Sequence, residues 1–172
     1  MNKIFFYALL SLVLFSCAKS KHKIGDMYKG GYIFKINIWG KGYCAAPKDK
    51  TFFRWGCYGT LVENGDGQNV GDGKQNTKDI LSGCSDANCA AKVCDDFVSD
   101  GYEDWYLPSI GELELMYNKL YVNDLGDFKA ETYWSSSQNY SLGAWALDFT
   151  SGERTNSLSK NTYLLVRPIR SF

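Results

Sequence analysis

The pattern of apolar and polar positions predicts short strands near both ends of the chain. Residues 30–36 are mainly apolar, and residues 42–46 form a second short apolar run that ends at a proline. Over residues 145–150, apolar side chains alternate with small or polar ones, which is the period of a half-buried strand. The apolar run at 163–170 predicts a last, buried strand, and the proline near its end indicates a sheet edge or a bulge.

The middle of the chain has a helical period instead. Residues 63–75 are polar and rich in glycine, so they predict a surface loop. After this loop Asn76 or Thr77 would cap a helix that Gly83 interrupts, and a second periodic run covers residues 88–97.

A further helix begins at a capping box. The segment Ser109-Ile110-Gly111-Glu112 follows a proline and opens a periodic apolar run that reaches Leu120. Strands, two main helices and then strands again predict an α+β domain with short antiparallel strands.

The first residues are typical of an export signal. The uncharged run at 4–15 has 12 residues, whereas a bilayer-spanning helix needs about 20. It ends in Leu14-Phe15-Ser16-Cys17, which resembles the bacterial lipobox, in which the cysteine is acylated. We expect a lipoprotein signal peptide at 1–16, a lipidated tether at 17–28 and one folded domain at 29–172. An ordinary signal peptide and a small membrane anchor are the alternatives.

Export makes disulfides the expectation for the remaining cysteines. These are Cys44, Cys57, Cys84, Cys89 and Cys94. Their spacing does not match the paired CxxC motifs of a zinc site, and the single histidine lies in the tether, so we predict no metal site. Because five is an odd number, at least one thiol stays unpaired or pairs between molecules.

Charge and chemistry exclude several classes of function. The chain has 19 Lys and Arg against 19 Asp and Glu, and this balance argues against nucleic-acid binding. The loop at 63–75 has oxygen ligands for calcium, but their spacing does not match an EF-hand, so we predict no cofactor. We find no nucleophile with a base and an orienting group, and so we predict no enzymatic activity.

Several motifs follow one another as they do in a single bacterial family. The most specific are Trp105-Tyr106-Leu107-Pro108-Ser109, Tyr133-Trp134-Ser135-Ser136-Ser137 and Val166-Arg167-Pro168-Ile169-Arg170, and others lie at 45–49, 54–60, 73–77 and 144–145. From about residue 30 to the C-terminus, this ordered set resembles the Lcl C-terminal domain family. The resemblance implies a C-type-lectin-like fold, and the family's named member is an adhesin that binds sulfated polysaccharides and assembles as a trimer.

The resemblance carries further implications. Cys57, Cys84 and Cys94 fall at positions where family members often have cysteine, whereas Cys44 and Cys89 are additions that could form an extra bridge. A homo-oligomer is implied as well. However, the adhesin's collagen-like stalk is absent here, and the near-zero net charge does not suit a binder of sulfated polymers.

Ligand contact is expected on polar loops that a rigid sheet displays. We predict Asn139, Tyr140, Arg154 and Asn156 as ligand-binding residues, with Tyr140 stacking on a sugar or protein surface and Arg154 gripping a carboxylate or sulfate. Other polar and aromatic motif residues have structural roles instead. We expect three core tryptophans, Trp105, Trp134 and Trp145, and an internal ion-pair network of Asp104, Glu112, Arg167 and Arg170.

These features together predict a lipid-anchored protein of the bacterial cell envelope, at the outer membrane, with the membrane as a partner through its lipid. Its domain would bind a glycan or a protein, as an adhesion or recognition module. The alternatives are a lectin-fold enzyme related to the sulfatase-activating oxygenases and a purely structural envelope lipoprotein.

The lipid anchor gives the first testable prediction. Replacing Cys17 with Ser removes the thiol that would be acylated, so the protein should appear in the soluble fraction or remain as an uncleaved precursor. Globomycin, which inhibits lipoprotein signal peptidase, should cause the wild-type precursor to accumulate in membrane fractions. Unchanged processing under globomycin would contradict acylation.

Overall fold

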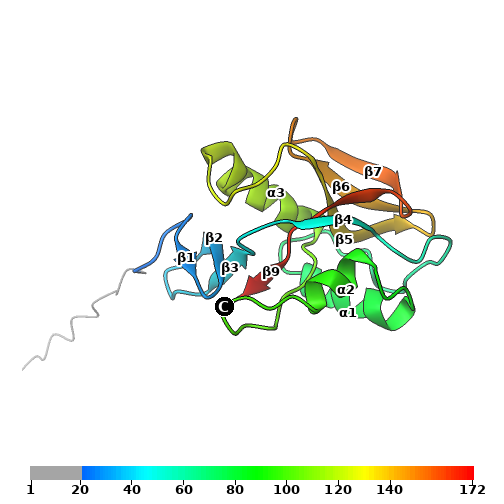
Figure 1. Cartoon of the computed structure of the whole chain (residues 1–172), viewed down its shortest axis with the longest axis horizontal. Coiled ribbons are helices and arrows are strands. Elements are labelled where there is room, and N and C mark those ends of the chain that lie inside the picture. The colour runs from blue at the N-terminus through cyan, green and yellow to red at the C-terminus, as the bar shows by residue number, and fades with distance from the viewer. Residues whose placement is uncertain (1–20) are drawn as a thin grey trace, which may run out of the picture.

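Two β-sheets divide the residues that the computed structural model describes, 21–172 (Figure 1). The smaller sheet has the order β1 (Met27–Tyr28), β2 (Gly31–Ile36), β3 (Gly42–Ala45) and β9 (Ile169–Ser171). The larger sheet has the order β4 (Lys50–Arg54), β8 (Tyr163–Val166), β5 (Thr132–Tyr140), β6 (Gly143–Asp148) and β7 (Arg154–Ser159). Neighbouring strands run antiparallel except β5 and β8, which pair in parallel. The predicted acylation site, Cys17, lies outside the described residues.

Three α-helices lie between β4 and β5 in the described chain: α1 (Gly73–Gly83), α2 (Ala90–Asp95) and α3 (Ile110–Lys119), which a short 3-10 helix, η1 (Tyr121–Asn123), follows. The predicted α+β class is therefore confirmed. The finer expectation of a C-type-lectin-like fold stays a prediction.

The capping box at the start of α3 is confirmed and also holds the start of α1. The Ser109 hydroxyl accepts a hydrogen bond from the Glu112 amide, and the Glu112 carboxylate accepts one from the Ser109 amide at 2.8 Å. The same carboxylate accepts from the amide of Gly71 at 3.1 Å. Burial raises the pKa of Glu112 to about 7, against the lowering effect of these backbone hydrogen bonds. A side chain at Gly73 would collide with this carboxylate, which explains a glycine there.

The core beneath α3 is aromatic. The rings of Tyr133 and Phe149 lie 4.4 Å apart, and Tyr117, Tyr121 and Phe128 surround Phe149. The predicted core positions of two other aromatic residues are confirmed, because Trp105 and Trp134 are buried. Trp145 is only half-buried, so its predicted core position is not met, and the pairing of β6 with β7 has a register shift at this position.

The first helix begins earlier than predicted. Its N-cap is Asp72, and both Asn76 and Thr77 lie inside α1. These two side chains are buried because they serve distant backbone: Asn76 donates to the carbonyl of Gly67, and the Thr77 hydroxyl accepts from the amide of Leu107 at 3.0 Å. The cap-like polarity of these residues therefore reflects tertiary hydrogen bonds.

The predicted single strand at 163–170 is wrong. The segment forms two strands in different sheets, β8 and β9, because Arg167 and Pro168 interrupt the hydrogen bonding between them. Proline cannot donate to a ladder, so the chain leaves the larger sheet here and joins the smaller one.

Arg167 holds this crossing point. Its guanidinium is fully buried and pairs with Asp49 at 2.6 Å. It also donates to the carbonyls of Ala46, Gly126 and Asp127 at 2.7 to 2.8 Å. The predicted single ion-pair network is therefore wrong. Arg167 pairs with Asp49, Arg170 forms a separate pair with the partly exposed Asp104, and the Glu112 carboxylate accepts from backbone amides.

Replacing Arg167 with Met should destabilise the domain strongly. The change leaves the nearly buried Asp49 carboxylate without its charged partner and three carbonyls without donors, so we expect a loss of about 3–5 kcal/mol in the free energy of unfolding. Urea unfolding measures it. The matched control is Arg154→Met, which removes a partly exposed ion pair with Glu114 and should cost less than about 1 kcal/mol. Similar losses in both variants would contradict this role of Arg167.

Candidate functional site

Three of the four predicted ligand-binding residues lie at one end of the larger sheet. Tyr140 pairs with Gly143, which in turn pairs with Ser159 at the end of β7. The Asn139 side chain donates to the Asn156 carbonyl at 2.6 Å, so these two residues are in contact. Asn139, Tyr140 and Asn156 are all exposed. Asn139 and Tyr140 lie on β5 and Asn156 on the edge strand β7, where we had expected loops.

A second segment completes an apolar surface at this end. The amide of Gly59, in the loop that follows β4, donates to the carbonyl of Ser141 at 3.0 Å in the turn between β5 and β6. This hydrogen bond brings together two segments that carry exposed apolar side chains. We call these side chains the Tyr140 surface: Tyr58, Leu61, Tyr140 and Leu142. Sequence reasoning missed Tyr58 and Leu61, because their proximity to Tyr140 depends on this contact between residues about 80 positions apart.

Lys160 fixes the loop from beneath. Its ammonium group donates to the Thr60 carbonyl at 2.9 Å and to the Gln138 side-chain oxygen at 3.1 Å, and it lies 4.3 Å from the centre of the Trp55 ring. Gln138 in turn accepts from the Val62 amide at 3.0 Å and donates to the Val62 carbonyl. Burial lowers the pKa of Lys160 to about 8. Gln138 lies in a segment expected to contact ligand, but its side chain is buried in this network.

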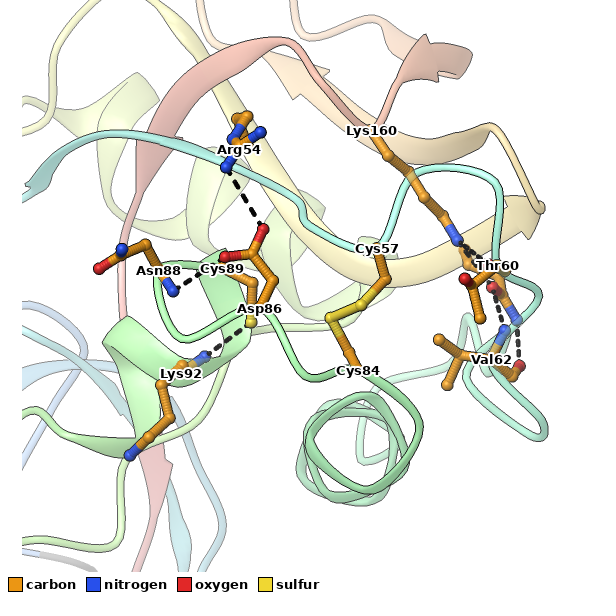
Figure 2. Close-up of a disulfide and its surroundings, with 11 residues drawn as sticks. Arg54, Cys57, Thr60, Val62, Cys84, Asp86, Asn88, Cys89, Lys92 and Lys160 are labelled. Atoms are coloured by element: carbon orange, nitrogen blue, oxygen red, sulfur yellow. Dashed lines mark hydrogen bonds and ion pairs between the residues drawn. A yellow bond between two sulfur atoms is a disulfide. The ribbon is translucent and has the colours of Figure 1, made fainter.

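A disulfide fixes the start of the same loop. Cys57 and Cys84 are bonded, which confirms the prediction of at least one disulfide and joins the loop after β4 to the end of α1. Figure 2 shows this bond beside the Lys160 hydrogen bonds to the same loop. The disulfide and the hydrogen bonds of the Lys160 ammonium group therefore hold the loop of the Tyr140 surface at both of its ends, which limits the conformational freedom that a ligand would have to remove.

Arg154 lies at the other end of β7 from the strand end that adjoins Tyr140, although it is only two residues from Asn156. It pairs with Leu147, while the Tyr140 end of β7 is at Ser159, five residues further on. At about 3.3 Å per residue, that separation is about 16 Å along the strand. The guanidinium forms two hydrogen bonds with the carboxylate of Glu114 on α3, and this pairing raises its pKa. A ligand at Arg154 would have to compete with Glu114, and ligand binding there stays a prediction.

The three remaining described cysteines are free and buried: Cys44, Cys89 and Cys94. The suggested extra bridge between Cys44 and Cys89 is therefore wrong. Burial raises the pKa of Cys44 to about 12 and also raises that of Cys94. Cys89 is the N-cap of α2, where its sulfur accepts from the Lys92 amide, as Figure 2 shows. These thiols act as small apolar core groups.

Within residues 21–172, no three His, Cys, Asp or Glu side chains are grouped so that they could hold a metal ion. In the predicted polar loop, the Asp72 carboxylate accepts hydrogen bonds from the amide and side chain of Asn69. None of the helices in this part of the chain is long and apolar enough to cross a membrane.

Comparisons with known proteins agree with the resemblance read from the sequence. The sequence model of the Lcl C-terminal domain matches residues 46–170. Among solved structures, the chain is similar to a fimbrial protein from Bacteroides ovatus ATCC 8483, with a TM-score of 0.54 and 15% identity over 76% of this chain and 36% of that chain. At this identity the likeness concerns the fold alone, and it spans about a third of the fimbrial protein. No curated protein sequence matches.

Lys160 gives a prediction about pH. The unfolded chain keeps its proton up to about pH 10.4, whereas the folded domain should release it near pH 8. The unfolded state then binds more protons between these values, so the contribution of Lys160 to stability should rise with pH by roughly 3 kcal/mol over this range. Nuclear magnetic resonance of ¹³C-labelled lysine should detect one side chain that titrates near pH 8. The signal should vanish in Lys160→Met, which should also lack this rise, and its persistence would contradict the assignment.

Proposed function

The chain belongs to the Lcl C-terminal domain family, and we propose that it is a binding or adhesion module displayed on the bacterial cell envelope by a lipid at Cys17. The observation that carries the proposal is the Tyr140 surface, where apolar side chains are exposed on a loop fixed by the Cys57–Cys84 disulfide and by Lys160. Exposed apolar groups on a rigid scaffold are typical of recognition sites. The fold similarity to a fimbrial protein supports a role at the cell surface.

The ligand we propose is a glycan or a protein with neutral, partly apolar contact groups. Tyr140 is 41% exposed and presents a flat ring with a hydroxyl, which suits stacking on a sugar ring or packing at a protein interface. Asn139 and Asn156 beside it supply amide groups for polar contacts. Because the four side chains of the Tyr140 surface carry no charge, salt should weaken binding only modestly.

The chemistry of the described thiols argues against the enzymatic alternative. A reactive cysteine needs an exposed, low-pKa thiolate, whereas Cys44 and Cys94 are buried and their pKa values are raised. The structural alternative, a lipoprotein that only packs against a partner, differs from our proposal in having no soluble ligand. Assembly into a homo-oligomer stays a prediction.

The Tyr140 surface gives a binding test. We expect the wild-type domain to bind members of a glycan array, and Tyr140→Ala to weaken that binding about 30-fold, the effect of removing one central aromatic contact. The melting temperature should hardly change, since the ring is exposed. The matched control is Phe52→Ala, which removes an exposed ring from the edge strand β4, two strands away from β5, and should bind normally.

Each outcome separates the alternatives. Equal binding by wild type and Tyr140→Ala would place the site elsewhere, and Arg154→Ala on the same array would then test the other predicted position. Absence of binding to any glycan, together with co-purification of a tightly packed envelope protein, would favour the structural alternative.

A further inference from the structure

The hairpin between β2 and β3 exposes two large apolar side chains at its tip. Trp39 is 79% exposed and Ile38 is 59% exposed. The tip is a defined turn, because the Asn37 side-chain oxygen accepts from the amides of Trp39 and Lys41, both at 3.0 Å. Gly40 has a φ of 77°, which completes the turn. A rigid turn thus presents an indole ring to solvent. Exposure of so large an apolar group is unfavourable in free energy unless it contacts another protein or a membrane.

Charge is strongly segregated toward the same end of the chain. Residues 21–43 contain five lysines against one aspartate, a net charge of +4, whereas residues 44–172 contain 12 Lys and Arg against 18 Asp and Glu, a net charge of −6. Lys35 and Lys41 flank the hairpin tip, and both are exposed. They also line an open groove of about 600 Å³ that Tyr43 and Phe172 complete. The near-zero net charge of the whole chain is therefore the sum of a basic segment at 21–43 and an acidic remainder.

The described chain is fixed to the domain from its first residues. The His22 ring stacks on Tyr28 at 4.0 Å, and Tyr28 meets the edge of Phe172 at 5.3 Å. Phe172 exchanges two backbone hydrogen bonds with Gly42, the first residue after the hairpin tip. Cys17 and His22 are five residue steps apart along the chain, and at about 3.6 Å per step they are separated by at most about 18 Å. A lipid at Cys17 would therefore hold this end of the domain close to the bilayer.

We propose that the β2–β3 hairpin docks on an anionic phospholipid surface, with Trp39 and Ile38 at the interface and Lys35 and Lys41 on headgroup phosphates. Tryptophan favours the interfacial region of a bilayer, and lysines near an anionic surface add electrostatic attraction. This inference rests on the lipid anchor of the proposed function. It goes beyond that function because it assigns a second contact with the membrane and a fixed orientation to the domain.

The orientation has a consequence for recognition. Figure 1 places β1, β2 and β3 at one end of the long axis and β5, β6 and β7 toward the other. Docking through the hairpin would therefore point the far end of the larger sheet, with the Tyr140 surface, away from the bilayer.

The test couples the chain from Cys17 onward to a maleimide phospholipid through the Cys17 thiol. This chain contains all of the described fold, and its other free thiols are buried. Vesicles of phosphatidylcholine and phosphatidylglycerol carry bromine on their acyl chains, which quenches tryptophan that reaches the interface. We expect more quenching in wild type than in Trp39→Phe, since three of the other four tryptophans are buried. Vesicles of phosphatidylcholine alone should quench less.

Matched charge variants make the test specific. Lys35→Gln with Lys41→Gln should lower the docking equilibrium about 30-fold, at roughly 1 kcal/mol for each lysine near an anionic surface. Lys74→Gln with Lys78→Gln, on exposed positions of α1, makes the same change in net charge and should quench as wild type does. Equal quenching in wild type and Trp39→Phe, or equal losses in both lysine pairs, would overturn the proposal. Because the coupling is chemical, these outcomes do not depend on acylation in the cell, which globomycin tests separately.

Discussion

The buried guanidinium of Arg167 is the constraint on which the arrangement of the two sheets depends. A charge without solvent must have its hydrogen bonds satisfied by protein, and here the acceptors come from two separate stretches of chain. Asp49 and Ala46 lie between β3 and β4, and Gly126 and Asp127 lie between η1 and β5. All of them meet at the point where the chain passes from β8 to β9. One side chain therefore holds together the two segments that connect the sheets, β3 to β4 and β8 to β9.

Local signals predicted the local structure well. The Ser109 and Glu112 capping box was identified because both partners lie within one turn of helix. The division into two sheets was not predictable, since it depends on Arg167 finding acceptors more than 100 residues away. Strands β4 and β7 escaped notice because their exposed positions carry no regular apolar alternation. The prediction that Asn76 or Thr77 caps a helix was wrong, because their side chains form hydrogen bonds with backbone groups outside the helix instead of with a helix end.

The candidate site divides in the same way. Tyr140 and its two asparagine neighbours could be selected from the sequence, because a polar stretch with an aromatic residue indicates a displayed loop, although these residues in fact lie on strands. Tyr58 and Leu61 could not, since only the hydrogen bond from Gly59 to Ser141 brings their loop to Tyr140. Arg154 was grouped with Tyr140 by closeness in sequence, whereas the register places it near α3 and Glu114.

The Cys57–Cys84 disulfide gives the chain a dependence on where it is in the cell. Its bond closes the loop that carries Tyr58 and Leu61, and such bonds form in oxidising compartments and are rare in the reducing cytosol. A precursor still awaiting export would keep that loop untied, with the two apolar side chains free to move. If the chain is exported as we propose, the loop of the Tyr140 surface would be fixed only after the chain has left the cytosol, so a precursor would lack the rigid form of the proposed binding surface.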